Sequence, residues 1–204
     1  MSTSKILLIA AAVLVVIVLI FGFGVAGSYN GLVQLDQQTQ AAWAQVQGAY
    51  QRRLDLIPNL VETVKGAANF EKDTLTAVTE ARSKVGQMTP QALENTINDP
   101  AAFKRFEQAQ AGLGSALQRL MVVVEKYPEL KATQAFRDLS VTLEQTENRI
   151  GVERKHYNDA AKEFNIRRER FPTVFIASLF GDKFKPKVFF SADAGAEKAP
   201  SVKF

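Results

Sequence analysis

The chain has 204 residues, no cysteine, one histidine and a formal net charge of +4. This length predicts one domain together with any targeting segment. The lack of cysteine excludes disulfides, thiolate zinc sites, cysteine nucleophiles and a lipid-modified cysteine. The small net charge gives no support to nucleic-acid binding.

The first feature along the chain is an apolar run from Ile6 to Gly27 without a charged side chain. As a helix, these residues would extend roughly 33 Å, and a bilayer core about 30 Å thick needs about 20 apolar residues. The run therefore predicts a transmembrane anchor. A cleaved signal peptide is the alternative, since Lys5 gives a positive start and Val25-Ala26-Gly27 a small-residue end. We favour the uncleaved anchor because a signal peptide usually has only about 7–15 apolar residues.

The stretch from Gly22 to Gly27 reads G-x-G-x-x-G, the spelling of the dinucleotide-binding fingerprint. That fingerprint has meaning only between a strand and a helix. The apolar run is too long for a strand and no strand–helix alternation follows, so we reject dinucleotide binding. The glycines can let a partner helix approach, through Gly27 and Gly31 in G-x-x-x-G spacing. They can also loosen the exit from the membrane, which is the interpretation that we favour.

Few charges flank the apolar run. Lys5 and the N-terminal amine precede it, and Asp36 is the first charge after it. The positive-inside rule then places the N-terminus in the cytoplasm and the remainder of the chain outside the membrane.

Beyond the anchor, apolar residues recur at intervals of three and four, which predicts an all-α fold with four long helices. Their apolar stripes are Leu32, Leu35, Thr39, Trp43, Val46 and Tyr50; then Ile57, Leu60, Val61, Val64, Ala68, Leu75, Val78 and Val85; then Phe103, Phe106, Leu113, Leu117, Leu120, Val124 and Tyr127; and last Phe136, Leu139, Leu143, Thr146, Ile150, Glu153, Tyr157, Ala160 and Phe164.

Proline and glycine mark the expected connections. Residues 55–59, around Pro58, should break the first stripe from the second, and residues 86–100 should form the main loop. Asp99 and Pro100 should cap and begin the third helix. Pro128 should interrupt that helix or begin the next.

Four long helices with short connections predict an antiparallel up-down-up-down four-helix bundle, and the fourth stripe has the 3.5-residue period of a coiled-coil seam. We expect residues 1–27 to form a cytoplasmic stub and transmembrane anchor, residues 28–190 the bundle, and residues 191–204 a disordered C-terminal tail. In this arrangement the fourth helix returns toward the bilayer.

The returning end, residues 167–190, is both basic and aromatic. Its members are Arg167, Arg168, Arg170, Lys183, Lys185 and Lys187, with Phe171, Phe175, Phe180, Phe184, Phe189 and Phe190. Such a composition near a membrane exit can make an interfacial contact. The alternative, which we favour at this point, is that Phe171 to Phe180 close the open end of the bundle as core.

Metal chemistry has one candidate motif. Glu153-x-x-His156 matches half of a di-iron bundle site, with Glu62 and Glu107 as imaginable further ligands. A single histidine cannot supply the second motif, so we expect no metal and no cofactor unless a dimer shares the site.

Other polar residues suggest structure rather than chemistry. Arg154 and Lys155 are the expected charge partners of Glu153, and without a serine motif near the histidine we expect no catalytic residue. The segment Arg52 to Asp55 could bind an anion, but we favour an ordinary ion pair at a helix end. Asparagines within the helical patterns should make hydrogen bonds between helices. These are Asn30, Asn148, Asn158 and Asn165.

Several blocks of sequence resemble the bacterial LemA family. They are Tyr29-Asn30-x-Leu32-Val33, Ala42-Trp43, RRLDLIPNLVETVKG (Arg52 to Gly66), Tyr127-Pro128-Glu129-Leu130-Lys131, ENRIGVERKHYNDAAKEFN (Glu147 to Asn165) and Phe171-Pro172. The resemblance covers about residues 5 to 190. It implies an N-terminal membrane anchor and a helical bundle, but no defined activity and no catalytic residue. Some members carry a lipid-modified cysteine, and some relatives look like membrane-organelle factors.

Three hypotheses of function follow. The leading one is a single-pass scaffold or interaction protein of the bacterial inner membrane. It would have no enzymatic activity, nucleic acid or small-molecule substrate, and its partners would be the lipid bilayer, other proteins or itself. The second is a membrane-remodelling or lipid-surface-binding protein that uses the anchor and residues 167–190. The third, ranked last, is a metal-binding bundle enzyme.

Overall fold

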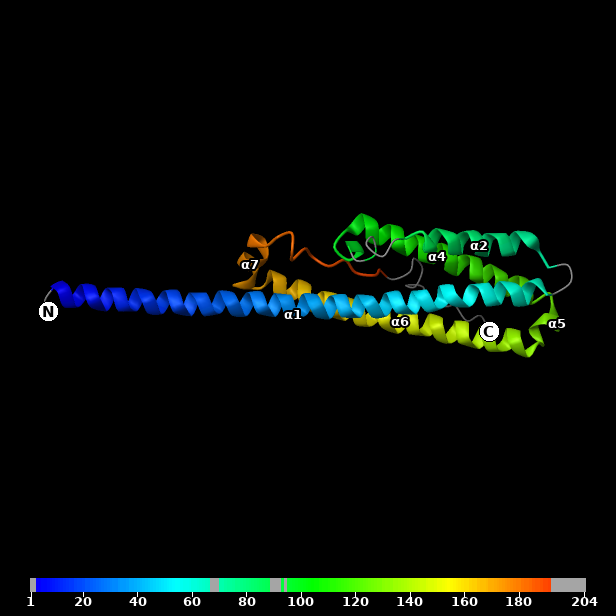
Figure 1. Ribbon diagram of the computed structural model, residues 1–204, viewed down its shortest axis with the longest axis horizontal. Helices are drawn as coiled ribbons and strands as arrows, with labels where there is room; N and C mark the ends of the chain where they lie inside the picture. The colour runs from blue at the N-terminus through cyan, green and yellow to red at the C-terminus, as the bar shows by residue number, and fades with distance from the viewer. Residues whose placement is uncertain (1–2, 67–69, 89–92, 94, 192–204) are drawn as a thin grey trace, which may run out of the picture. The chain divides into compact units, whose positions relative to one another are not determined.

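In the computed structural model, residues 3–66, 70–88, 93 and 95–191 are described, and their regular structure is entirely helical. This confirms the predicted all-α class. The helices in Figure 1 are α1 (Thr3–Lys65), α2 (Lys72–Gly86), α4 (Pro100–Val124), α5 (Pro128–Lys131), α6 (Gln134–Glu169) and α7 (Thr173–Leu179). The predicted tail, apart from Ser191, lies outside the described residues.

The helix break predicted at residues 55–59 is wrong, because α1 continues through Pro58 to Lys65. Proline has no N–H, so it leaves the carbonyl four residues earlier, that of Leu54, without its helical donor. The Nε–H of Arg82 on α2 donates to this carbonyl at 3.3 Å. A side chain distant in sequence therefore satisfies the oxygen that the proline frees, and the turn between the first two helices falls after Lys65 instead.

The predicted start of α4 is confirmed. The carboxylate of Asp99 accepts hydrogen bonds from the backbone N–H of Ala101 at 2.8 Å and of Ala102 at 3.2 Å. Pro100 occupies the first turn, where its missing N–H costs nothing. At the other end α4 stops at Val124, and Pro128 begins the short helix α5.

The chain divides into two compact units, which we describe separately. Unit 1 consists of residues 1–42 and 159–187, and unit 2 consists of residues 43–158 and 188–204. Helices α1 and α6 each contribute residues to both units. The limits expected from the sequence, residues 1–27, 28–190 and 191–204, stay a prediction.

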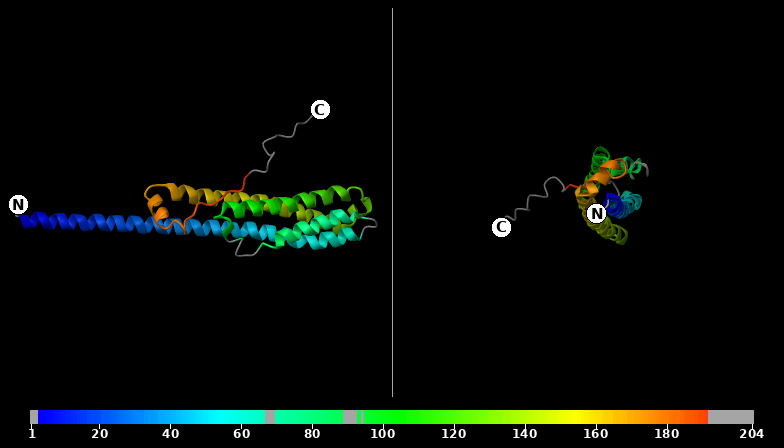
Figure 2. Two further views of the ribbon diagram at one scale, coloured as in Figure 1. Left: turned by 90° about the horizontal axis from the view of Figure 1, so that it is seen from above. Right: turned by 90° about the vertical axis from the view of Figure 1, so that its left-hand side faces the viewer.

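Unit 2 contains one large apolar core to which α1, α2, α4, α5 and α6 all contribute. Helices α2 and α4 lie side by side in Figures 1 and 2. The buried members of the core are Leu54, Ile57, Leu60, Val61, Val64, Phe70, Val78, Val85, Leu113, Leu117, Leu120, Val123, Val124, Leu130, Phe136 and Leu143. Most of them come from the predicted stripes, so the helical period correctly identified the buried faces.

The stripe predicted for the last long helix is largely buried along α6. The buried positions are Phe136, Leu143, Thr146, Ile150, Glu153, Tyr157, Ala161 and Phe164. Ala161 takes the place expected for Ala160, which is half-buried. Two of the buried positions, Thr146 and Glu153, are polar, so this seam is not purely hydrophobic.

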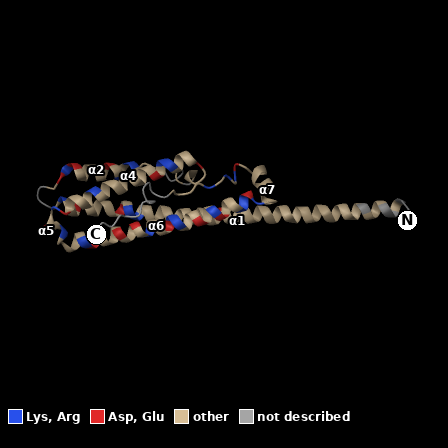
Figure 3. Cartoon of the chain, turned by 180° about the vertical axis from the view of Figure 1, so that it is seen from behind, with Lys and Arg blue, Asp and Glu red and all other residues tan. Residues whose placement is uncertain are grey.

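The N-terminal length of α1, in unit 1, is apolar and exposed. The side chains of residues 7–9 and 11–23 are exposed, with exposed fractions of 71% for Leu7 and 77% for Phe23. Figure 3 shows this length of helix without charged residues. Among the described residues, α1 is the helix that is long and apolar enough to cross a membrane, and a signal sequence can satisfy the same criteria.

Candidate membrane-facing site

The glycines of the apolar run lie inside α1. Gly22, Gly24 and Gly27 have open space where a Cβ would stand, and no strand precedes them, so the structure agrees with rejecting the dinucleotide fingerprint. The preferred interpretation, a loosened membrane exit, is wrong because the helix is continuous there. A Cβ on Gly31 would stand 3.6 Å from the guanidinium of Arg167. Gly31 therefore faces the end of α6 within unit 1.

Helix α7 has two different apolar faces. Thr173, Ile176 and Ala177 are buried. Phe175 and Leu179 lie on the other side, with 65% and 76% of their side chains exposed. Phe171, just before the helix, is 81% exposed and its ring makes an edge contact with Phe175 at 5.9 Å between centroids.

The buried face of α7 completes a small core in unit 1. Its buried members are Leu32, Phe164, Ile176, Ala177 and Phe184, with Val25, Tyr29, Val33 and Leu35 packed around them. Val25 belongs to the apolar run, and the others on α1 follow it. This core therefore attaches α7 to α1 at the end of the predicted membrane span.

Tyr29 is the main link between α1 and the segment that follows α7. Its ring makes edge contacts with Phe180 at 5.2 Å and Phe184 at 5.6 Å between centroids. The ammonium of Lys183 donates to the Tyr29 hydroxyl at 2.6 Å and lies 4.9 Å from the ring centroid.

The backbone after α7 is held by polar side chains of unit 1. The Nε–H of Arg168 donates to the carbonyl of Phe184 at 2.7 Å. Asn165 makes a two-way pair with Lys187. Its Nδ2–H donates to the Lys187 carbonyl at 2.9 Å, and its Oδ1 accepts from the Lys187 amide at 2.8 Å. The segment needs these partners because extended backbone has no internal hydrogen bonds.

Lys187 forms a buried ion pair with Asp36 in unit 1. The Nζ of Lys187 lies 2.5 Å from Oδ1 of Asp36, and their side chains are 1% and 10% exposed. The other carboxylate oxygen of Asp36 accepts from Nε2 of Gln40 at 2.7 Å. The Phe164 ring lies 4.8 Å from the ammonium. Lys187 is therefore a structural residue, not one of the free surface cations expected from the sequence.

Residues 167–190 thus divide between the two expected roles. The favoured interpretation placed Phe171 to Phe180 in a core, and within that range Ile176 and Ala177 do join one, together with Phe184 beyond it. The phenylalanines of that range, Phe171, Phe175 and Phe180, are exposed, so for them the interpretation is wrong. Helix α7 therefore has an exposed apolar side as well as the side that packs in the core of unit 1.

The asparagines predicted to bond between helices have a different role. Asn158, in unit 2, donates to the carbonyl of Phe190 at 3.0 Å and accepts from its amide at 2.9 Å. This is the same two-way pairing that Asn165 makes in unit 1. Both asparagines hold extended backbone, while Asn30 and Asn148 have exposed side chains.

The Glu153-x-x-His156 motif, which matches half of a di-iron site, makes contacts within the protein. Glu153 is buried and pairs with the Nε of Arg149 at 2.5 Å and with Nδ1 of His156 at 3.4 Å. Arg154, one of the two expected charge partners, donates to the carbonyl of Ser191 at 3.0 Å.

Glu62, another imagined metal ligand, has a side chain that is 70% exposed and pairs with Lys65 at 2.7 Å. Across the described ranges, no group of three or more His, Asp or Glu side chains could hold a metal ion. The structure therefore adds no support to the metalloenzyme hypothesis.

Arg53 is a buried part of unit 2, not a helix-end residue. Its Nη1 donates to both carboxylate oxygens of Glu147, at 3.0 and 3.2 Å, and its Nη2 to the carbonyl and side-chain oxygen of Gln110. Its guanidinium also lies 5.1 Å from the ring centroid of Tyr50. Asp55 accepts from Gln51 instead of pairing with Arg53. These contacts engage both terminal guanidinium nitrogens of Arg53 within the protein.

The buried hydroxyl of Tyr157 should make the stability of unit 2 depend on pH in the alkaline range. This hydroxyl donates to the Val188 carbonyl at 2.7 Å, and burial raises its pKa well above the ordinary value near 10. The folded state then keeps the proton that the unfolded chain releases. The stability present below about pH 10 is therefore expected to fall as the pH rises further, by at most about 1.4 kcal/mol per pH unit for this group.

The measurement is denaturant unfolding of the chain and of Tyr157→Phe between about pH 8 and pH 11. At the lower pH the variant should lose about 1 kcal/mol with the hydrogen bond. At higher pH the stability of the variant should fall less steeply than that of the unchanged chain. Some pH dependence should remain, because burial also raises the pKa of Tyr50. Equal slopes for both proteins would contradict this account.

These features define a class: an all-helical protein with one candidate membrane span at its N-terminal end. The chain belongs to the LemA family, whose family model matches residues 42–204. It is 28% identical over 169 residues to magnetosome protein MamQ 2 of Paramagnetospirillum magneticum, which covers 76% of this chain and 62% of that protein.

Two further relatives have similar levels of identity. Magnetosome protein MamQ of Magnetospirillum gryphiswaldense is 26% identical over 169 residues, covering 76% of this chain and 62% of the relative. Protein LemA of Metamycoplasma hominis is 27% identical over 163 residues, covering 78% of this chain and 67% of the relative. The match to the MamQ proteins thus spans less than two thirds of their length.

Proposed function

We propose that this chain is a single-pass, membrane-anchored scaffold or interaction protein of the bacterial inner membrane. Residues 6–27 cross the bilayer with the N-terminus in the cytoplasm, and the remaining helices stand in the periplasm or outside the cell. The long helices α1, α2, α4 and α6 act as an antiparallel four-helix bundle, a rigid body suited to presenting surfaces to other proteins.

One observation carries this proposal: the exposed apolar length of α1 continues without a break into helix that belongs to the folded body. Burying large apolar side chains stabilises a soluble protein by about 1.5–3 kcal/mol each, so a run of exposed ones calls for a bilayer or another cover.

The polar side chains that suggested chemistry support a structural role. Arg53, Glu153, Asn158 and Asn165 are all engaged with other parts of the chain. A catalytic group must reach a substrate, and these groups are occupied by internal partners. Names of relatives that refer to the magnetosome fit a role at a membrane, although the match covers only part of those proteins.

Crosslinking in native membranes tests the proposal, because the chain has no cysteine of its own. A single cysteine at Gln108, Gln118 or Lys155, all exposed, would carry a photo-activatable crosslinker. We expect adducts to a second copy of the chain or to one recurring protein. A matched cysteine at Val18 should give lipid adducts. The absence of recurrent protein adducts from all three positions would contradict the scaffold, as would reproducible turnover that a point mutation abolishes.

The exposed face formed by Phe171, Phe175 and Leu179 supports a second candidate, a protein that binds or remodels a lipid surface. Vesicles made with and without the full chain separate this candidate from a plain scaffold. A remodelling protein should change vesicle size or shape at a protein density where a Phe175→Ser variant does not.

A further inference from the structure

An apolar face of α7 remains without a partner in unit 1. The face consists of Phe175 and Leu179, which are four residues apart in α7 and lie on one side of it, and of Phe171 just before the helix, whose ring contacts that of Phe175. The side chains of Phe171, Phe175 and Leu179 are 81%, 65% and 76% exposed. The opposite side of α7 is already used, since Ile176 and Ala177 are buried in the core that joins α7 to α1.

The position of α7 along α1 indicates what covers this face. The core beneath α7 includes Val25 and Tyr29. Val25 is in the last turn of the apolar run, and Gly27 ends that run. A run of this length is roughly 33 Å long, against about 30 Å of hydrocarbon, so its end lies at the boundary between acyl chains and headgroups. Helix α7 is therefore held at the depth of that boundary.

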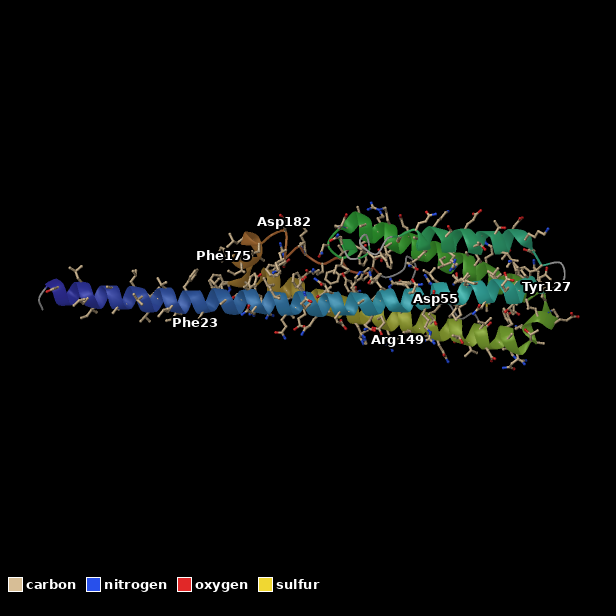
Figure 4. The ribbon with its side chains drawn as sticks, in the orientation of Figure 1. Phe23, Asp55, Tyr127, Arg149, Phe175 and Asp182 are labelled. Atoms are coloured by element: carbon tan, nitrogen blue, oxygen red, sulfur yellow. The ribbon has the colours of Figure 1, made fainter. Side chains whose placement is uncertain are left out.

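Figures 1 and 2 show α7 beside α1 at the end of α6, next to the N-terminal length of α1. Phe23 on α1 and Phe175 on α7 are labelled in Figure 4. An apolar face at this level meets lipid before it meets water.

The polar residues around α7 also suit the headgroup region. Tyrosine is enriched at membrane interfaces, where its ring lies among acyl chains and its hydroxyl among polar groups. The Tyr29 hydroxyl accepts from the ammonium of Lys183, which is exposed on its other sides. Arg170 and Lys185 are exposed as well. Basic residues at this depth can contact lipid phosphates, and long stems allow their charges to stay in the polar layer.

We infer that the face formed by Phe171, Phe175 and Leu179 inserts into the boundary between headgroups and acyl chains of the same bilayer that α1 spans. The inference rests on the proposed function, since it needs residues 6–27 in the membrane. The occupant of this face is the lipid bilayer itself, in contact with the protein beside its span. Helix α7 is then a second membrane contact that restricts rotation of α1 about its own axis.

The test measures how deeply single spin labels lie in the bilayer. The full chain, with one cysteine at Phe175, is spin-labelled and reconstituted into nanodiscs of phosphatidylethanolamine and phosphatidylglycerol. Collisions with oxygen, which concentrates in the acyl region, are compared with collisions with a water-soluble nickel chelate. Because the Phe175 side chain is exposed, a label there should leave the fold intact. We expect oxygen to dominate at Phe175.

Two further labels serve as controls. Phe189, like Phe175, is a partly exposed phenylalanine, with 43% of its side chain accessible, but it lies outside α7 and outside unit 1. The nickel chelate should dominate there. Phe23 lies within the apolar run, so oxygen should dominate at this position whatever α7 does.

The outcomes distinguish the two proposals. Oxygen dominance at Phe23 and Phe175 with nickel dominance at Phe189 supports the inference. Nickel dominance at Phe175 with oxygen dominance at Phe23 overturns the inference and leaves the span intact. Equal ratios at Phe175 and Phe189 also overturn it, because the contact would not be specific to α7. Nickel dominance at Phe23 overturns the proposed membrane span and the inference with it.

Discussion

Replacing Asp36 by alanine should weaken unit 1 by about 3–5 kcal/mol, because it removes the carboxylate that pairs with the buried charge of Lys187. The Lys187 side chain is 1% exposed and its ammonium contacts the Asp36 carboxylate directly. The expected result is local opening of the segment that contains Lys187. Its amide, which donates to Asn165, then exchanges with solvent more readily.

Native-state hydrogen exchange at the Lys187 amide measures this effect. A loss of about 3–5 kcal/mol corresponds to protection reduced by roughly two to four orders of magnitude. The double variant Asp36→Leu with Lys187→Met should recover much of the protection, since it removes both charges and keeps apolar volume. Gln40→Ala, which removes only a neutral hydrogen bond to Asp36, should cost about 1 kcal/mol. Full protection in Asp36→Ala would show that the ion pair does not hold the segment.

Replacing Phe103 by alanine should destabilise unit 2 by about 3–5 kcal/mol, the usual cost of removing a buried aromatic side chain and leaving a cavity. Phe103 is 1% exposed. Its ring centroid lies 4.8 Å from that of Phe190, 5.9 Å from that of Trp43 and 6.2 Å from that of Tyr157. The variant removes one of the two rings that α4 places against Trp43, the other being that of Phe106.

Denaturant unfolding followed by tryptophan fluorescence is the appropriate measurement, because Trp43 is the only tryptophan in the chain and it contacts Phe103. Val122→Ala on the same helix is the matched control. Val122 is 67% exposed, so its truncation should change the free energy of unfolding by no more than about 0.5 kcal/mol. Similar losses for both variants would indicate that the aromatic group does not form a close-packed core.

Helix starts and buried faces could be predicted from the sequence because they depend on local chemistry. Asp99 and Pro100 supply both the acceptor and the restricted backbone that begin α4. The apolar period of α6 identified the buried positions from Phe136 to Phe164 with one small shift. The same reasoning failed at Pro58. The helix continues there with a hydrogen bond from Arg82 to the Leu54 carbonyl, and no local sequence pattern predicts this distant contact.

The candidate site was only partly predictable. The phenylalanines among basic residues correctly indicated residues 167–190 as the candidate site. Helix α7 has apolar residues on both sides, so the spacing of its apolar residues does not distinguish the buried side from the exposed one. The apolar character of Phe171 and Phe175 suggested that they would be buried, whereas Ile176 and Ala177 are the residues that pack in the core with α1. The pairing of Asn165 with Lys187 was missed because extended backbone without alternation leaves no repeating signal.

The most direct test of the central claim is thiol labelling of two single-cysteine variants in intact cells with a membrane-impermeant maleimide. The account predicts that cysteine at Gln108, exposed in unit 2, is labelled from outside. Cysteine at Leu14, in the middle of the apolar run, should stay unlabelled until detergent dissolves the membrane. Rapid labelling at Leu14 in intact cells, or none at Gln108, would contradict a single-pass anchor with an external helical body.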